Sequence, residues 1–222
     1  MNRRLLAASL AAVLAPIASA DVITGKYSGQ YSKNVTIQTP TYNGGASGSV
    51  PTVTFNWQRT DSPGPGVDNL IANEFVTYCV DLGQSVSSGT NHTYDVLTTA
   101  QAGYSQGVSD RLGRLWSSFQ GDVNNATESA AFQTAIWEVL LDTDGDVSTG
   151  LFKASSPSSV TNQAQAWVDA VMDANYSGGT AELRVLHSQS VQDQITVVPA
   201  PGFAFLFCAG LLAAKRRGRA TT

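Results

Sequence analysis

Two apolar segments bracket the chain and confine any folded domain to the residues between them. Residues 1–20 begin with the basic pair Arg3-Arg4, continue as an apolar run and end in three small residues, the last of which is Ala20. This order is typical of a secretory signal peptide cleaved after Ala20, and the run is too short for an anchoring helix. We therefore predict that the protein is exported.

The other end of the chain has a different order of motifs. In residues 199–222 a proline pair is followed by the apolar stretch 202–214 and then by a basic cluster. A helix of this stretch reaches about 20 Å, less than the roughly 30 Å of a bilayer core. We expect a short transmembrane helix that holds a membrane only marginally, with the basic cluster on the cytoplasmic side. The residues that define the pattern are Pro199, Pro201, Arg216 and Arg217.

This tail resembles the PEP-CTERM sorting tail of Gram-negative envelope proteins, with Ala200 at the position of the usual glutamate. In that family an exosortase recognises the tail and removes it. The resemblance implies a protein that crosses the inner membrane, is anchored there transiently, and is released to the cell surface or an exopolysaccharide matrix.

The charge of the body between these ends excludes some partners. Residues 21–198 hold all seventeen acidic residues of the chain but only seven of the thirteen basic ones. Such an acidic body repels phosphate, so nucleic acid and anionic membrane surfaces are poor partners. The length of this body suits one extracytoplasmic domain with its own core.

Strand and helix patterns alternate along the body. Polar–apolar alternation predicts strands, 3.6-residue spacing predicts amphipathic helices, and Asn125 with Glu128 resembles a helix-capping box. The pattern predicts an α+β fold, with a β-rich sandwich or barrel scaffold and a helical lobe inserted after the strand that holds Cys79. The expected strands lie within 22–67 and over 74–82, 180–187 and 192–198, and the expected helices over 108–119, 125–142 and 160–175.

The chain has two cysteines, and because Cys208 lies in the apolar tail, the exported body holds only Cys79. An unpaired thiol in an oxidising compartment has three explanations. It can be a buried inert residue, form an intermolecular disulfide, or be reactive. A reactive thiol needs a partner side chain.

Histidine is the first partner to consider, because an adjacent base activates a thiol. His92 lies in a loop-like stretch, and His187 ends a predicted strand. Cys79 is expected in mid-strand, whereas cysteine hydrolases place the nucleophile at a helix N-terminus, where the dipole lowers its pKa. A cysteine hydrolase is therefore the third-ranked hypothesis.

Glutamine is the better partner. The strand Phe75–Leu82 contains Cys79, and the predicted helix contains the run from Gln133 to Trp137 (Gln-Thr-Ala-Ile-Trp). Together, in this order, the two segments resemble the halves of the Cys–Gln thioester domains of bacterial surface adhesins. Similar pairs are also usual among exported proteins that carry the sorting tail described above.

The resemblance implies an internal thioester. The Cys79 thiolate would attack the Gln133 carboxamide and expel ammonia, and the product would acylate one amine- or hydroxyl-bearing partner. Such a protein is a single-use covalent clamp rather than a turnover enzyme, and it needs no cofactor or metal. Trp137 lies one helical turn from Gln133 and could cover the bond, while Asp81, on the same strand face as Cys79, is a candidate for proton handling.

Two alternatives accompany this hypothesis. In the first, the protein is a non-reactive envelope or exopolysaccharide-associated structural protein with a buried Cys79. The second concerns residues 142–153, whose acidic start invites a calcium site, since calcium prefers oxygen ligands. Glycine and glutamate do not stand at the EF-hand positions there, so an acidic loop that ends a helix is favoured.

Overall fold

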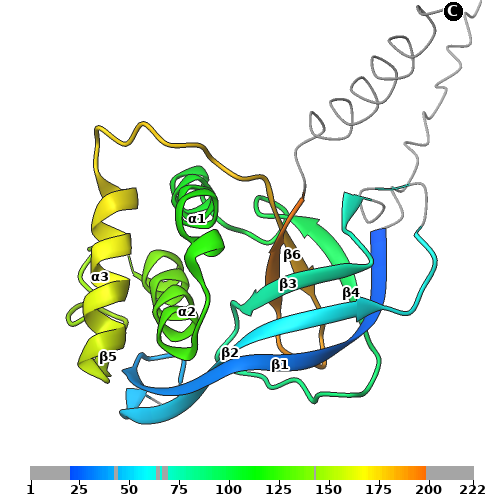
Figure 1. The fold of residues 1–222 in the computed structure, drawn as a ribbon, viewed down its shortest axis with the longest axis horizontal. Coiled ribbons are helices and arrows are strands. Elements are labelled where there is room, and N and C mark those ends of the chain that lie inside the picture. Colours follow the sequence, from blue (N-terminus) through cyan, green and yellow to red (C-terminus); the bar gives the residue numbers. More distant parts are fainter. Residues whose placement is uncertain (1–20, 43–44, 64–65, 67–69, 143, 199–222) are drawn as a thin grey trace, which may run out of the picture.

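The computed structural model describes residues 21–42, 45–63, 66, 70–142 and 144–198 (Figure 1). The predicted signal peptide with Ala20 and the predicted sorting tail lie outside the described residues, and so does the expected C-terminal membrane helix. Within the described ranges, no helix has the length and apolar character needed to cross a membrane.

A large antiparallel sheet forms the scaffold. Strand β1 is long and pairs with β2 along most of its length and with β4 near its start. The order continues from β2 through β3, β7 and β6 to β4, so the sheet closes on itself. The strands are β1 (Asp21–Gln38), β2 (Gly48–Arg59), β3 (Glu74–Cys79), β4 (His92–Thr98), β5 (Lys153–Ser156), β6 (Leu183–His187) and β7 (Gln194–Val197). β5 pairs with the far end of β1.

Aromatic side chains fill the space between these strands. Trp57 on β2 is buried, and its ring lies 5.4 Å from that of Tyr27 on β1 and 5.5 Å from that of Tyr94 on β4. The Trp57 indole N–H donates to the Thr77 hydroxyl at 2.8 Å. Because Trp57 joins three strands, it fixes how β3 sits beside β2.

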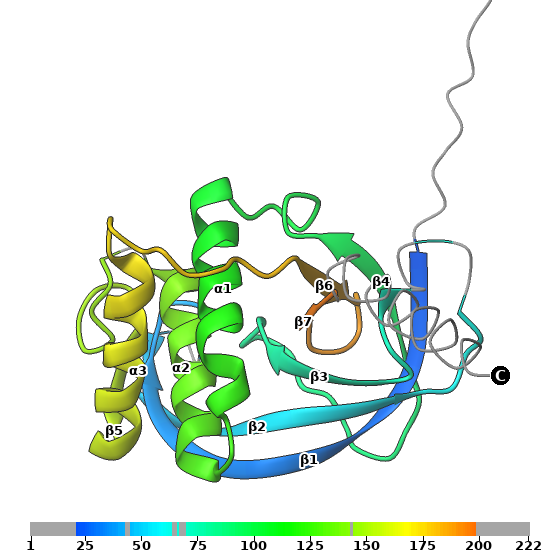
Figure 2. The same cartoon turned by 45° about the horizontal axis from the view of Figure 1, so that its top comes forward.

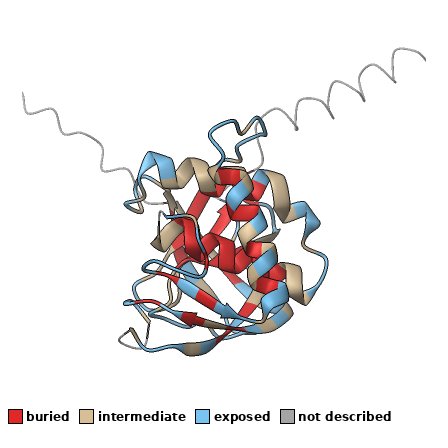
Figure 3. Cartoon of the chain, turned by 90° about the vertical axis from the view of Figure 1, so that its left-hand side faces the viewer, coloured by how far each residue is buried: buried red, intermediate tan, exposed pale blue. Residues whose placement is uncertain are grey.

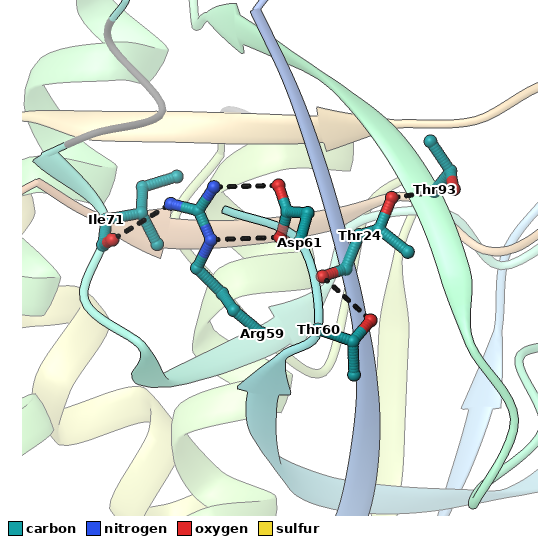
Figure 4. Close-up of polar contacts among 6 residues, drawn as sticks. All are labelled: Thr24, Arg59, Thr60, Asp61, Ile71 and Thr93. Carbon is teal, nitrogen blue, oxygen red and sulfur yellow. Dashed lines mark hydrogen bonds and ion pairs between the residues drawn. The ribbon is translucent and has the colours of Figure 1, made fainter. Parts of the chain in front are cut away.

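A buried arginine stabilises one end of the sheet through hydrogen bonds (Figure 4). Arg59 ends β2, and its guanidinium meets Asp61 through Nε–Oδ1 at 3.1 Å and Nη2–Oδ2 at 2.8 Å. A third nitrogen, Nη1, donates to the Ile71 carbonyl at 3.3 Å. Beside it, the Thr24 carbonyl of β1 accepts from the Thr60 backbone N–H at 2.9 Å. These contacts join the chain before β3 to the β1–β2 hairpin.

Three helices pack on the side of the molecule away from the C-terminal end of β2, beside the curved part of β1 and β2 (Figures 1 and 2). The helices are α1 (Gln106–Phe119), α2 (Ala126–Leu141) and α3 (Ser158–Met172), with a short 3-10 helix, η3 (Gln120–Asp122), after α1. Helix α2 contacts α1, α3, β1 and β2. Every residue of α2 from 129 to 139 is buried, as expected for a helix surrounded by protein. Figure 3 shows that the buried residues concentrate where helices and sheet meet.

The N-terminus of α2 is fixed by side chains. Asn125 Oδ1 accepts from the backbone N–H groups of Thr127 (2.9 Å) and Glu128 (3.1 Å). Glu128 reaches back to the N–H of Asn124 at 2.7 Å, one residue before the position expected for a capping box. The predicted cap is confirmed, and it sets where Gln133 falls along the helix.

The structure confirms the mixed α and β architecture and differs in several details. The predicted strand 74–82 ends at Cys79, where its ladder with β7 ends and after β2 has stopped pairing at Thr77, so Cys79 is the last strand residue rather than a central one. The stretch at His92, expected to be loop-like, begins β4, and β5 was not expected at all. The helices follow β4 rather than the Cys79 strand directly, and so lie between β4 and β6.

Candidate functional site

Cys79 lies where β3 loses one of its two neighbours. On one side β3 pairs with β7, where Cys79 is opposite Gln194 and the Val80 N–H donates to the Asp193 carbonyl. On the other side the pairing with β2 ends at Thr77. Since backbone groups of successive strand residues point to alternate sides, the N–H and C=O of Cys79 face the side that β2 has left.

The side chain of Gln133 occupies that vacated side. The Cys79 N–H donates to Gln133 Oε1 at 2.9 Å, and Gln133 Nε2 donates to the Cys79 carbonyl oxygen at 2.8 Å. Both residues are buried, with exposed fractions of 3% for Cys79 and 1% for Gln133. The carboxamide therefore replaces a strand residue in the ladder, and the backbone N–H and C=O of Cys79 hold its two ends.

The thiol itself is neutral at ordinary pH. Burial raises the pKa of Cys79 to about 12. Cys79 Sγ donates to the Asp81 backbone carbonyl at 2.9 Å, and the Gln192 side chain donates to the same oxygen at 3.1 Å. The Asp81 carboxylate, our candidate for proton handling, instead accepts from the Gly83 N–H at 2.7 Å. It is the backbone of Asp81, not its side chain, that meets the thiol.

Trp137 follows Gln133 by one turn on the same face of α2. Its side chain is buried, with 2% exposed, and its indole N–H makes no hydrogen bond. Cys79, Gln133 and Trp137 together line a cavity of about 260 Å³. The structure thus brings three of the four predicted site residues to one cavity, with Asp81 next to it through its backbone.

The walls of this cavity are largely apolar and aromatic, and the described residues that line it include no charged side chain. Its other polar side chains are Gln84, Ser85 and Gln192, together with the hydroxyl-bearing Tyr27 and Tyr42. A larger hollow of about 770 Å³ lies against α3 and β5, and none of the predicted site residues lines it. The main wall residues of the smaller cavity are Tyr27, Tyr42, Val53, Phe55, Leu82 and Val86.

Neither histidine serves the thiol. His187 Nδ1 lies 2.8 Å from Asp193 Oδ2, and this hydrogen bond raises the pKa of the imidazole. His92, the first residue of β4, has its Nε2 2.8 Å from the Ser87 carbonyl oxygen. In the part of the chain that the structure describes, the recorded partner of the Cys79 thiol is a carbonyl oxygen rather than a base. This arrangement does not support a Cys–His hydrolase.

The acidic segment after α2 behaves as a helix terminator. Asp142 is the C-cap residue of α2, and its carboxylate accepts from the backbone N–H groups of Leu151 and Phe152. Asp146 accepts from the Ser148 N–H at 2.9 Å. Among the described residues, no three carboxylate, thiol or imidazole side chains form a group that could hold a metal ion.

Sequence reasoning missed two groups near the site. The first is the backbone of Cys79, which holds the Gln133 amide; no residue pattern announces it, because it depends on where β2 departs. The second is Glu138, next to Trp137, which is fully buried with no hydrogen-bond partner for either carboxylate oxygen. Burial, followed by the charges of Asp144 and Asp142, raises the pKa of Glu138 to about 8.

The geometry can be compared with known families. Residues 76–177 match the model of the thioester domain family. This match supports a thioester-domain protein, and the matched segment holds Cys79, Gln133 and Trp137. It omits the β1–β2 hairpin and β6 and β7, although these strands complete the sheet around Cys79. Comparisons with curated proteins and with solved structures gave no match.

Proposed function

We propose that this protein forms an internal thioester between Cys79 Sγ and Gln133 Cδ and uses it once to attach covalently to an amine- or hydroxyl-bearing partner. The observation that carries the proposal is the pair of hydrogen bonds between the Gln133 carboxamide and the Cys79 peptide groups. These bonds hold a poor electrophile beside a thiol, which is the positioning that makes an unactivated amide reactive. The thioester-domain match supports the same assignment.

The proposed loading reaction follows from these contacts. Cys79 sulfur adds to the carbonyl carbon of Gln133, and the negative charge develops on Oε1. The Cys79 N–H already points at that oxygen, so it serves as a preorganised oxyanion donor. The C–N bond then breaks, the thiol proton ends on the leaving nitrogen, and ammonia departs.

The stored thioester then acylates its partner. An amine or hydroxyl enters the cavity and attacks the carbonyl carbon, the C–S bond breaks, and Cys79 is released as a thiol. The new amide or ester joins the partner to residue 133. Each chain reacts once, so the protein is a covalent clamp and not a turnover enzyme.

The test is the intact mass of the purified protein. A loaded chain is lighter than its sequence by one ammonia, and methylamine takes the place of that ammonia, so the treated chain is heavier than its sequence by one CH2 group. Cys79→Ala and Gln133→Ala should both abolish the mass deficit and the adduct. Gln165→Ala, which removes a glutamine of α3, is the matched control and should retain both. A wild-type chain of full mass that ignores methylamine would instead support the non-reactive envelope or matrix protein.

We further propose that the protein works outside the inner membrane of a Gram-negative bacterium. The signal-like residues 1–20 and the tail with its proline pair and basic cluster support this. An exosortase-type enzyme would remove the tail after transient anchoring and release the protein to the surface or matrix. The test is the mass of the released protein: it should begin at Asp21 and lack the basic cluster, and Arg216→Ala with Arg217→Ala should leave the chain membrane-bound and uncut.

A further inference from the structure

We infer that the indole N–H of Trp137 is the hydrogen-bond donor that stabilises negative charge on Cys79 Sγ when the thioester forms and when it opens. This inference rests on the proposed function of the Cys79–Gln133 pair and assigns its third chemical group. A thioester can form or open only if the sulfur carries charge in the transition state, and here it must do so in a buried site.

The first observation is that the Trp137 N–H is an unused donor. Its nitrogen is one of the few buried side-chain polar atoms, among the described residues, that lack any hydrogen-bond partner. Leaving a buried N–H unpaired costs stability, and such exceptions in folded proteins call for an explanation. By contrast, the buried indole N–H of Trp57 donates to the Thr77 hydroxyl. The fold therefore supplies a hydrogen-bond acceptor to a tryptophan whose role is packing.

The second observation is the position of the indole. Trp137 and Gln133 are neighbours on one face of α2, and both line the cavity onto which Cys79 opens. The indole lies near enough to the sulfur to lower the pKa of Cys79, although burial outweighs it and leaves that pKa at about 12. A neutral thiol is a weak acceptor, whereas a thiolate is a strong one, so the N–H gains its partner only as charge develops.

Among the side chains that act on the sulfur, Trp137 is the one that lowers the pKa of Cys79, and the backbone of Asp81 lowers it as well. The Asp81 carbonyl accepts from the thiol, and an acceptor repels the same sulfur once it is a thiolate. The charges of Asp81 and Asp193 also oppose the thiolate and raise the pKa of Cys79. The Cys79 N–H is directed at Gln133 Oε1, where it stabilises the oxyanion. The oxyanion therefore has the Cys79 N–H as its donor, and the indole of Trp137 is the side-chain donor left for the sulfur.

The opening reaction shows what this donor does. The amine nitrogen attacks the carbonyl carbon at residue 133, and collapse of the adduct breaks the C–S bond with its electron pair left on sulfur. The proton lost by the amine nitrogen ends on Cys79 Sγ. Between these events the sulfur is anionic, and the Trp137 N–H would hydrogen-bond to it.

Trp137→Phe separates this role from simple shielding, because it keeps an aromatic ring and removes the N–H. If Trp137 only covered the bond, the variant would react with methylamine as fast as the wild type or faster. If it is the donor, loaded Trp137→Phe should discharge about tenfold to a hundredfold more slowly, as expected for losing one charge-assisted hydrogen bond. Trp167→Phe, which removes a buried indole of α3, is the control and should discharge at the wild-type rate.

The measurement is the time course of methylamine addition to the full chain by intact mass. Unchanged or faster discharge of Trp137→Phe, with a loaded wild type, overturns the inference and leaves the proposed function standing. A wild type that carries no thioester overturns the proposed function and the inference with it.

A second measurement does not depend on loading. In a Gln133→Ala chain the thiol is free, and its rate of alkylation by iodoacetamide at pH 8 is proportional to the thiolate fraction. Adding Trp137→Phe should slow alkylation of the Cys79 peptide about tenfold, because one lost donor raises the pKa by about one unit. Loosened packing would speed it instead. An unchanged or faster rate contradicts the donor role, and Trp167→Phe in the same background is again the control.

Discussion

The rings of Tyr78 and Phe132 lie 4.7 Å apart and are inclined by 56°. Each residue directly precedes one member of the proposed reactive pair, Tyr78 before Cys79 on β3 and Phe132 before Gln133 on α2. Both rings are fully buried. This contact therefore fixes the distance between strand and helix at the position where the thiol and the carboxamide must meet.

Phe132→Leu should lower the stability of the protein and disturb the site together. We expect a loss of about 1–2 kcal/mol in the free energy of unfolding, from smaller buried area and a lost aromatic contact. The fraction of chains with the ammonia mass deficit should also fall. Phe75→Leu is the control. Phe75 is another aromatic residue of β3, and its ring stacks on Trp57 of β2, so the change should lower stability without changing the fraction of loaded chains. Denaturant unfolding and intact mass measure the two effects, and equal loading by both variants would contradict this role.

Glu138 should make the protein less stable as pH rises. Its pKa is raised to about 8, chiefly by burial, from an ordinary value of 4.5. Between these values the folded chain binds a proton that the unfolded chain has lost, so the free energy of unfolding falls as pH increases through this window. The effect is on the order of a few kcal/mol. Glu138→Gln should flatten this pH dependence, measured by denaturant unfolding from pH 4.5 to 8.

Glu128→Gln, which alters a partly exposed acid in the first turn of α2, is the control for Glu138 and should keep the slope of the wild type. A Glu138→Gln chain with an unchanged pH slope would show that this carboxyl group titrates normally in the folded protein.

The cap of α2 should matter more for the reaction than the cap of α1. Asn125→Ala removes a side chain that accepts two backbone N–H groups, and Ser105→Ala removes the one that accepts from Val108. Each should lower the free energy of unfolding by about 1 kcal/mol. Only Asn125→Ala should slow methylamine discharge, because only α2 holds Gln133. Equal discharge rates in the two variants would argue against a coupling between this cap and the site.

The two histidines should be dispensable for the chemistry at Cys79. His187 is paired with Asp193, and the His92 imidazole contacts the Ser87 carbonyl oxygen at the start of β4. His92→Ala and His187→Ala should each keep the ammonia mass deficit and discharge within about twofold of the wild-type rate, since neither is a base for the thiol. Loss of all reaction at Cys79 in either variant would revive the cysteine hydrolase.

Local patterns in the sequence located the elements that carry the site. The 3.6-residue spacing placed Gln133 and Trp137 on one helix face, and the Asn125 cap marked the helix start. Period-two alternation placed Cys79 on a strand. These features depend on neighbours within a few residues, which is why sequence spacing was sufficient for them.

Long-range pairings could not be predicted in the same way. The departure of β2 after Thr77 exposes the backbone of Cys79 to Gln133, and it depends on strands far apart in the chain. Strand β4 was not predicted. A serine- and glycine-rich run, which is typical of a loop, precedes His92, and the alternating segment that follows is short. Glu138 is charged and therefore expected at a surface, yet α2 is enclosed by its neighbours, so tertiary packing overrides that preference.

The central claim is that Cys79 sulfur and the Gln133 carbonyl carbon share a bond. Isotope-labelled methylamine followed by peptide mapping tests it most directly. We predict one label per chain, located at residue 133. We also predict that alkylating reagents modify Cys79 only after the methylamine treatment, because the treatment releases its thiol. An ordinary carboxamide at Gln133 and a free Cys79 thiol in the untreated protein would contradict the account.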